Sequence, residues 1–278
     1  MYYRPDNLND ALEVLCVNKL KIAAGCTDLF PATQNDFLGE NILDISGIDS
    51  LRSINVEKNF RRIGATTTWS DLIKFKLPDC YEMLKQCSKQ IGSKQIQNSG
   101  TIGGNLCNAS PAADGVPCLL SLNASIELSS KEKIRILKLE NFIKGSRDTE
   151  LQNNEILTAI LIPKKSENGK SSFVKLGARK YLVISIAMVA CKLEVFNDII
   201  TDMTISIGSC SAVAQRLKKL ENILIGKNIK SDLIHEIYKF KYNDFISPIN
   251  DIRGTDSYRI QVAKVLVKNS ILETIDKF

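Results

Sequence analysis

The chain has 278 residues, 44% of them hydrophobic and 24% charged, and its formal net charge is +6 at pH 7. This length exceeds that of one ordinary domain and predicts two or three compact units. The lysines are scattered and form no stripe with aromatic side chains, so nucleic-acid binding is not indicated. No run of about 18 uncharged apolar residues predicts a membrane span.

The N-terminus and the cysteines indicate a cytoplasmic protein. The opening sequence MYYRPDNLND contains no apolar signal region, so we expect no export. The eight cysteines are widely spaced, several of them within apolar runs, and no C-x-x-C pair occurs. Reduced thiols that act as small apolar side chains fit this pattern better than a disulfide framework or a metal site.

Residues 1–50 are predicted to form a small β–α–β-like unit. The expected elements are a helix over 8–15, a short strand over 22–24 and a strand over 42–45. The strand at 22–24 leads into a turn around Gly25. Thr27 or Asp28 is a candidate N-cap for a further helix that begins near Leu29, which would bring a helix N-terminus close to a phosphate.

The remaining chain reads as two α+β units with no repeated βαβ pattern. In residues 51–168 we expect strands over 62–65, 126–128, 134–137 and 155–162, a helix that starts at Thr68 or Ser70, and a helix over 78–89. Residues 164–172 read as a flexible linker or hairpin tip. In residues 169–278 we expect long antiparallel strands over 185–196 and 202–210, joined by a turn at Asn197-Asp198, and helices over 215–224, 232–240 and 255–275.

One segment is almost free of charge. Between residues 95 and 126 the only charged side chain is Asp114. Gly100, Gly103 and Gly104 free the main chain from Cβ atoms, and successive exposed N–H groups form anion-binding nests without a lysine. The segment therefore indicates a site for a large polar ligand. The alternative from the same residues is a cluster of Gly/Asn-rich turns.

The sequence of this segment resembles a motif of one protein family. Thr101-Ile102-Gly103-Gly104-Asn105, followed by the run NASPAAD at 108–114, resembles the central signature of the FAD-binding subunit of molybdenum hydroxylases, of the xanthine dehydrogenase and CO dehydrogenase type. The run IAAGCTDL at 22–29 resembles the family's first loop, although Ala24 and Cys26 flank a lone Gly25 where relatives usually have two glycines. Further matches follow in the family's order at 63–67, 155–157, 175–180, 251–254 and 258–259, and they cover nearly the whole chain.

The resemblance implies a fold and a domain division. The fold is α+β: a two-lobed PCMH-type FAD-binding fold of the vanillyl-alcohol oxidase group, followed by a small domain of antiparallel strands and a three-helix bundle. The implied units are FAD-binding subdomain 1 at 1–50, FAD-binding subdomain 2 at 51–168, and a CO dehydrogenase flavoprotein-like domain at 169–278. No G-x-G-x-x-G follows the first strand, so a Rossmann site is not supported.

The resemblance also implies which residues contact FAD, with no catalytic residue and no metal ligand in this chain. The first loop contributes Ile22, Ala23, Ala24, Gly25, Cys26, Thr27, Asp28 and Leu29. The second loop contributes Thr101, Ile102, Gly103, Gly104 and Asn105. Single contacts are Ile91, Asp114, Leu157 and Lys175. Both loops are expected to donate main-chain N–H groups to the FAD pyrophosphate.

Some of these residues have structural alternatives. Asp114 suits ribose or ribitol hydroxyls, but it also suits the N-cap of a helix that starts at Gly115. Ile91 and Leu157 are as well explained by core packing, and Lys175 by an exposed position on a strand. The segment from Arg179 to Ser185 should lie near the flavin edge, and many relatives have an aspartate where Ser185 stands. Trp69 and Tyr81 are expected in the core, and His235 is expected to be an ordinary helix residue.

The expected function is electron transfer within a complex. The resemblance implies a large molybdopterin-binding subunit and a small subunit with [2Fe–2S] clusters as partners, and NAD or another acceptor for the electrons. Two alternatives remain: a free-standing flavin oxidoreductase of the same fold, and a binding module that has lost the cofactor. A free-standing oxidoreductase requires a larger substrate-binding cap with acid–base groups. The region after Lys175 is short and contains few such groups.

Overall fold

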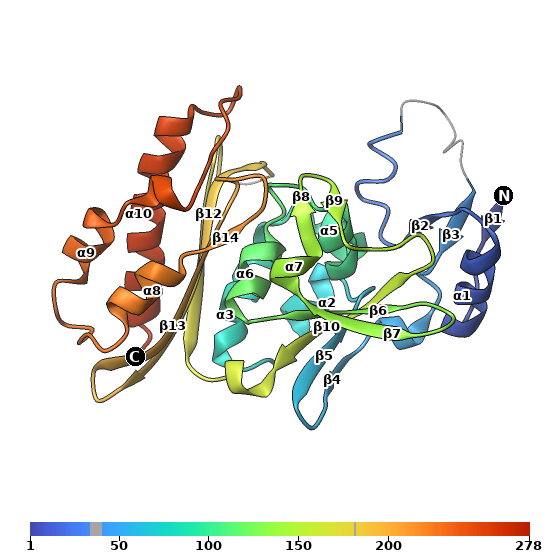
Figure 1. The fold of residues 1–278 in the computed structure, drawn as a ribbon, viewed down its shortest axis with the longest axis horizontal. Helices are drawn as coiled ribbons and strands as arrows, with labels where there is room; N and C mark the ends of the chain where they lie inside the picture. Colours follow the sequence, from blue (N-terminus) through green and yellow to red (C-terminus); the bar gives the residue numbers. More distant parts are fainter. Residues whose placement is uncertain (34–40, 181) are drawn as a thin grey trace.

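The computed structural model describes residues 1–33, 41–180 and 182–278, and its sheets follow one another along the long axis of the molecule (Figure 1). The N-terminal sheet lies at one end, the C-terminal sheet with its helices lies at the other, and the central sheet with its helices lies between them. None of the helices in these residues is long and apolar enough to cross a membrane.

The N-terminal sheet is parallel, in the order β1-β3-β2. Its elements are β1 (Tyr2–Tyr3), α1 (Leu8–Val17), β2 (Lys21–Ala23) and β3 (Ile42–Asp44). Asn7 caps α1 by accepting a hydrogen bond from the Asp10 N–H at 3.0 Å. Ala11, Leu12 and Leu15 of α1 are buried, as their helical spacing predicts.

The helix expected near Leu29 is not formed in the described residues. Residues 27–32 make hydrogen-bonded turns, in which Phe30 N bonds to Cys26 O at 3.3 Å and Ala32 N to Asp28 O at 3.1 Å. Pro31 has no N–H, so the bond to Thr27 O that would lie between these two cannot form. The continuation of that expected helix over 34–40 lies outside the described residues.

The central sheet is antiparallel, in the order β4-β5-β10-β6-β7. Its strands are β4 (Ile54–Val56), β5 (Phe60–Gly64), β6 (Ser125–Ser129), β7 (Ile134–Lys138) and β10 (Ile156–Pro163). The helices around it are α2 (Trp69–Lys74), α3 (Glu82–Gln90), α4 (Lys94–Ser99), α5 (Ile102–Asn108), α6 (Gly115–Ser121) and α7 (Leu139–Phe142), with the hairpin β8 (Ile143–Gly145) and β9 (Asp148–Thr149) after them. Thr68 and Asp71 form a capping box on α2. The uncharged segment is thus mostly helical, and every residue of α6 is buried.

The C-terminal sheet is antiparallel, in the order β11-β12-β13-β14. Its elements are β11 (Lys170–Gly177), β12 (Ser185–Phe196), β13 (Ile199–Gly208), β14 (Gln215–Arg216), α8 (Lys218–Leu224), α9 (Leu233–Lys239) and α10 (Asp256–Ile275). Asn197 and Asp198 both have positive φ, 52° and 62°, as a primed hairpin turn requires.

Two expectations for this unit are corrected. Residues 215–216 extend the sheet, and the helix expected from 215 begins only at Lys218, because Gln215 and Arg216 pair with Ile207 and Ser206. Residues 164–172 are not a flexible linker: a 3-10 turn at Lys164–Ser166 leads directly into β11, where Ser171 and Ser172 are fully buried. Ser171 is held there because its hydroxyl accepts from Met83 N at 3.0 Å and donates to Cys80 O at 2.8 Å.

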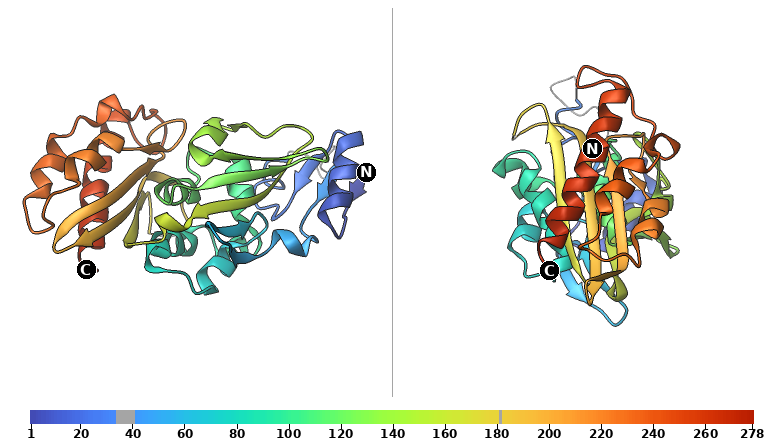
Figure 2. Two further views of the ribbon diagram at one scale, coloured as in Figure 1. Left: turned by 60° about the horizontal axis from the view of Figure 1, so that its bottom comes forward. Right: turned by 90° about the vertical axis from the view of Figure 1, so that its left-hand side faces the viewer.

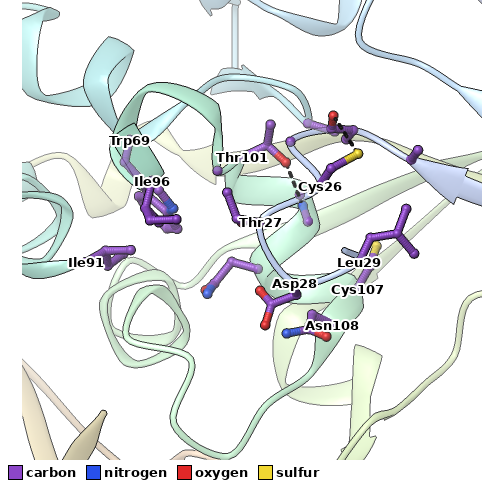
Figure 3. A pocket seen from close by; sticks show the side chains of 18 of the residues that line it. Cys26, Thr27, Asp28, Leu29, Trp69, Ile91, Ile96, Thr101, Cys107 and Asn108 are labelled. Atoms are coloured by element: carbon purple, nitrogen blue, oxygen red, sulfur yellow. Dashed lines mark hydrogen bonds between the residues drawn. The ribbon is translucent and has the colours of Figure 1, made fainter. Parts of the chain in front are cut away.

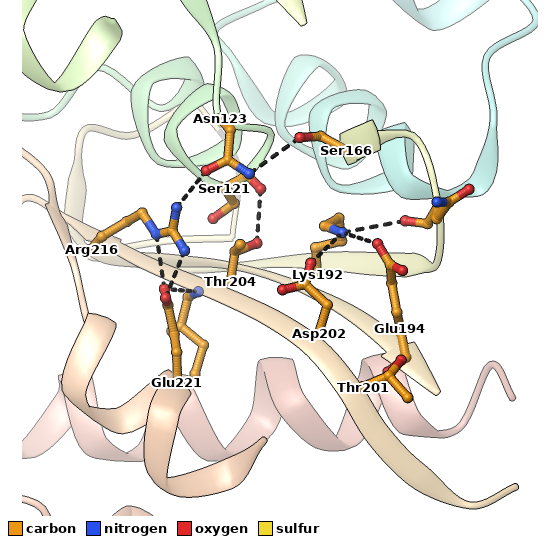
Figure 4. A network of polar contacts seen from close by, with 12 residues as sticks. Ser121, Asn123, Ser166, Lys192, Glu194, Thr201, Asp202, Thr204, Arg216 and Glu221 are labelled. Atoms are coloured by element: carbon orange, nitrogen blue, oxygen red, sulfur yellow. Dashed lines mark hydrogen bonds and ion pairs between the residues drawn. The ribbon is translucent and has the colours of Figure 1, made fainter. Parts of the chain in front are cut away.

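The C-terminal sheet lies between α10 on one face and helices α3 and α6 on the other (Figure 2). The α6 side of this junction is polar as well as packed, because Thr204 donates to Ser121 O at 2.8 Å and Ser121 donates to Ser206 at 2.9 Å. Lys192 is fully buried nearby and bonds to Glu194 and Asp202 at 2.7 and 3.1 Å (Figure 4). Because buried polar groups need partners at fixed positions, the bonds of Ser121 with Thr204 and Ser206 specify how α6 docks on the C-terminal sheet.

Candidate functional site

A cavity of about 820 Å³ is bounded by all three sheet-based units. The loop after β2 forms one wall, at the carboxyl end of the parallel strands, which is where open α/β sheets bind ligands. The segment from α4 into α5 and the start of β10 contribute further walls, and Leu182, Val183 and Ile184 come from the connection between β11 and β12. The volume is within the range of about 300–1,000 Å³ that is usual for ligand sites.

The loop of residues 24–29 offers main-chain donors to this cavity. Among the described residues, the N–H groups of Gly25 through Leu29 have no hydrogen-bond acceptor. The loop approaches the end of α4 so closely that a Cβ on Gly25 would overlap Ser99 O and lie 2.8 Å from the Ser99 carbonyl carbon. Cys26 has a left-handed backbone with φ 57°, which turns the chain back over the cavity. Successive unbonded N–H groups in a turn of this kind are the main-chain feature that anion-binding nests use.

The second loop differs from the expectation, because the main-chain N–H groups of Ile102 to Asn105 are already bonded within the protein. Ile102 N bonds to Thr67 O at 3.0 Å, and Gly103 N bonds to Ala65 O at 2.9 Å. Thr101, the N-cap of α5, accepts from Gly104 N at 3.1 Å through its hydroxyl. Gly103 is therefore needed for close packing on Ala65, while Gly104 is exposed at the cavity.

The side chains along the cavity differ between its two ends (Figure 3). Trp69, Ile91 and Ile96 gather at one end, and the loop with Cys26 and Asp28 faces the other. The first end is apolar. At the second end Cys107 and Asn108 project from α5, and burial raises the pKa of the Cys107 thiol to about 12, so it stays protonated.

One side-chain acceptor near the cavity lacks a partner. Asn105 lines the cavity, and its Oδ1 atom is buried without a hydrogen bond to any described residue. An unpaired buried polar atom costs free energy. A Cβ on Gly115 would lie 2.8 Å from this Oδ1 atom, so it faces the start of α6 and adds no contact to the donors of the first loop.

Three of the expected site residues do not line the cavity: Ile102, Asp114 and Lys175. Ile102 is fully buried in the core. Asp114 accepts from Lys175 Nζ at 2.6 Å and from Ser185 Oγ at 2.5 Å. Burial raises the pKa of the Asp114 carboxyl, while the Lys175 ammonium and the Ser185 hydroxyl oppose that rise.

This cluster decides between the alternatives for Asp114 and Lys175. Asp114 does stand just before α6, but its side chain makes no capping hydrogen bond. The Lys175 side chain is 7% exposed, so it is not an exposed strand lysine. Asp114 belongs to the central unit, whereas Lys175 and Ser185 belong to β11 and β12, so the cluster ties the two units together behind the cavity wall.

The other expected residues, 22–29, Ile91, Thr101, Gly103, Gly104, Asn105 and Leu157, all line the cavity. Leu157 and Trp69 also belong to the hydrophobic core, so packing and lining both apply to them. Tyr81 is fully buried, as expected. His235 lies in α9. Of the segment from Arg179 to Ser185, residues 182–184 line the cavity, Arg179 donates to Leu182 O, and Tyr181 lies outside the described residues.

Sequence reasoning missed several lining residues, including Lys21, Ile45, Ser93, Ile96, Cys107 and Leu151. Lys21 carries the only sequence signal, because it is a cation directly before the first loop. The other five are short or apolar side chains that the pattern of the chain does not distinguish from core. In residues 1–33, 41–180 and 182–278, no cluster of three or more His, Cys, Asp or Glu side chains is arranged to hold a metal ion.

Comparison with known proteins identifies the family of this chain. Residues 1–165 match the model of the FAD binding domain in molybdopterin dehydrogenase, and residues 172–274 match the CO dehydrogenase flavoprotein C-terminal domain. The glyceraldehyde dehydrogenase medium chain of Sulfolobus acidocaldarius is 32% identical over 98% of this chain and 97% of its own length. The nicotinate dehydrogenase FAD-subunit of Eubacterium barkeri is 31% identical over 99% of this chain and 96% of its own length.

Solved structures agree with the sequence matches. The reconstituted CO dehydrogenase from Oligotropha carboxidovorans contains a chain that superposes with a TM-score of 0.90 at 26% identity, over 98% of this chain and 96% of that chain. Quinoline 2-oxidoreductase from Pseudomonas putida 86 shares the fold with a TM-score of 0.89 at 22% identity, over 99% and 96% of the two chains. The chain therefore belongs to the family of FAD-binding medium subunits of molybdopterin dehydrogenases, oxidoreductases of the xanthine and CO dehydrogenase type.

Proposed function

We propose that this chain is the electron-transfer subunit of a xanthine dehydrogenase-like molybdenum hydroxylase complex, and that it binds FAD in the cavity between its units. The proposed fold is the two-lobed PCMH type, with subdomains at 1–50 and 51–168 and a C-terminal domain at 169–278 whose three helices form a bundle. The expected cytoplasmic location is part of the same proposal.

The single observation that carries this proposal is the set of open N–H groups from Gly25 to Leu29 at the cavity. A diphosphate needs several donors that converge on one point, and main-chain N–H groups supply them without added side chains. The absence of a Cβ at Gly25 brings these donors next to α4. The cavity therefore fits FAD: its apolar end suits a planar ring, and the first loop suits the diphosphate.

The residues of this chain bind and orient the cofactor in the proposal. Gly25 to Leu29 hold the diphosphate, and Gly104 leaves room for the cofactor against the start of α5. Leu182 to Ile184 exclude water from one wall because all three side chains are apolar. That Ile102, Asp114 and Lys175 contact FAD directly stays a prediction. In this structure the Asp114 carboxylate and the Lys175 ammonium form an ion pair, so their charges cancel behind the cavity wall.

FAD, when bound, accepts and passes on electrons, and the protein supplies its position and electrostatic surroundings. The proposed electron donor is the small [2Fe–2S] subunit, which receives electrons from a large molybdopterin-binding subunit where the substrate is hydroxylated. The proposed acceptor is NAD. One observation supports a subunit over a free-standing oxidoreductase: the relatives carry the names medium chain and FAD-subunit.

The test uses the chain's only tryptophan, Trp69, which lines the cavity. FAD added to the purified protein should quench Trp69 fluorescence saturably, give a bound flavin absorption spectrum and raise Tm by mass action. The isolated chain should reduce dyes with NADH at most and should hydroxylate no heterocycle. A protein that takes up no FAD would support the cofactor-free module, and substrate oxidation by the isolated chain would support the free-standing oxidoreductase.

A further inference from the structure

The wall formed by Leu182, Val183 and Ile184 has little packing of its own. Leu182 and Ile184 are 52% and 58% exposed. Leu182 also has a left-handed backbone with φ 53°, which is unfavourable for a branched side chain with a Cβ. Backbone strain of this kind persists only where neighbouring structure fixes the chain. The start of β12, immediately after the wall, is where such support would have to act.

Arg259 of α10 supplies that support from inside the C-terminal unit. Its side chain is 3% exposed, and its guanidinium donates to Ile186 O and, at 3.1 Å, to Ser209 O. Ile186 is the second residue of β12, two positions after the wall. The remaining partner of the guanidinium is Asp251, whose Oδ1 accepts at 2.7 Å and neutralises the charge.

The same arginine is connected to the central unit through one main-chain residue. Ser209, whose carbonyl accepts from Arg259, donates its own N–H to Pro111 O at 3.1 Å. Ser209 has φ 61°, again a left-handed conformation without glycine. Pro111 lies three residues before Asp114, which in turn holds Ser185 at the start of β12. Arg259 and Asp114 therefore hold the first two residues of β12 from different units.

We propose that Arg259 is a positioning residue for the flavin cavity, which acts through the wall at residues 182–184 and does not touch the cofactor. This inference rests on the proposed FAD site. A guanidinium suits this position because its planar fork reaches two carbonyls and a carboxylate at once. The three N–H groups of an ammonium all start from one nitrogen atom and cannot span these acceptors in the same way. Because Arg259 is buried, its replacement is costly: each carbonyl left without its donor loses a hydrogen bond inside the protein.

The test is a double-mutant cycle with Arg259→Lys and Leu182→Ala, read out by FAD Kd from Trp69 quenching and by visible circular dichroism of the saturated flavin. Arg259→Lys should raise the FAD Kd by about five- to tenfold and change the flavin dichroism. A change of this size is usual when one residue acts on a site through a residue that contacts both. If Arg259 acts through the wall, the two substitutions are not additive, and Arg259→Lys in the Leu182→Ala background changes Kd less than twofold (about the error of such cycles).

The matched control is Lys192→Met, which removes a second buried cation, one that lies on β12 itself but far along the strand from the wall. It should lower Tm and leave Kd and the dichroism unchanged. If Arg259→Lys does not fold, Asp251→Asn replaces it, since that carboxylate is 18% exposed and only its charge is lost.

Three outcomes overturn the inference. They are a wild-type Kd in Arg259→Lys, additive effects in the cycle, or an equal rise of Kd in Lys192→Met. These outcomes require that the wild-type protein binds FAD. If the wild-type protein binds none, the proposed function fails first and this inference fails with it, so the two failures are distinguishable.

Discussion

Replacement of Gly25 by alanine is the most direct test of the first loop. The new Cβ would overlap Ser99 O and lie 2.8 Å from the Ser99 carbonyl carbon and 3.0 Å from Gly100 Cα. Carbon atoms in contact are ordinarily about 3.5–4.0 Å apart, so the loop and the end of α4 must separate by roughly 1 Å. The obstacle is backbone on both sides, and no side-chain rotation removes it.

The expected loss follows from that displacement. A shift of about 1 Å takes an N–H···O bond from about 2.9 Å to a length at which no hydrogen bond exists. A hydrogen bond to a charged acceptor contributes about 1.5–3 kcal/mol, so the loss of one raises the FAD Kd by about 10- to 150-fold. Fluorescence titration of Trp69 measures this directly.

A glycine control separates the contact from general effects of the substitution. In Gly145→Ala the new Cβ meets only Asp148 Cβ, at an ordinary 3.7 Å. We expect its FAD Kd to stay within about twofold of wild type, because a surface change away from the site alters little. A Gly25→Ala protein that binds FAD as tightly as Gly145→Ala would refute the proposed role of the first loop.

Three further predictions concern the second loop, Cys26 and acid stability. Gly103→Val should lower the free energy of unfolding by about 1–3 kcal/mol, because its Cβ lies 2.7 Å from Ala65 O on the main chain. Gly104→Val should lower it less, because its Cβ meets only the Thr101 hydroxyl, at 2.8 Å, and it should abolish the FAD-dependent rise in Tm. Cys26→Gly should be more stable to denaturant than Cys26→Ala by roughly 1 kcal/mol, because only the alanine keeps a strained left-handed backbone. For Glu155, burial alone would raise the pKa of the carboxyl, but bonds from Arg135 and the Gln152 N–H bring it below its usual value. That stabilisation is present above the unfolded pKa of about 4.3 and is lost as pH falls through the lower folded pKa, so the stabilities of wild type and Glu155→Gln should differ at neutral pH and converge in acid below that folded pKa.

Local features of the fold could be predicted from sequence because their causes are local. The Asn7 cap, the Thr68 capping box and the turn at Asn197-Asp198 each depend on residues within four positions of one another. The strands and helices that alternate or repeat with a clear period were predicted for the same reason. Failures occurred where a distant partner decides: Gln215 joins the sheet because Ile207 pairs with it.

The candidate site shows the same division between local and distant causes. The motif at 101–105 lies at the cavity except for Ile102, but the N–H groups of Ile102 and Gly103 are bonded to Thr67 O and Ala65 O, and no spacing within the motif reveals those partners. Lys175 and Asp114 are 61 residues apart, so their ion pair could not be read from the sequence. The apolar wall at 182–184 looks like any short core segment until the fold places it at the cavity.

The unequal use of donors in the two loops leads to a final prediction about amide exchange. The N–H groups of Gly25 through Leu29 have no acceptor among the described residues, whereas those of Ile102 and Gly103 are already bonded within the protein. FAD should therefore slow hydrogen exchange strongly at 25–29, because those amides gain phosphate acceptors and open less often. Exchange at 102–104 should change much less, since its bonds exist before the ligand arrives. Equal protection of both segments would mean that the second loop reorganises to donate as well, and that the distinction drawn between the two loops is wrong.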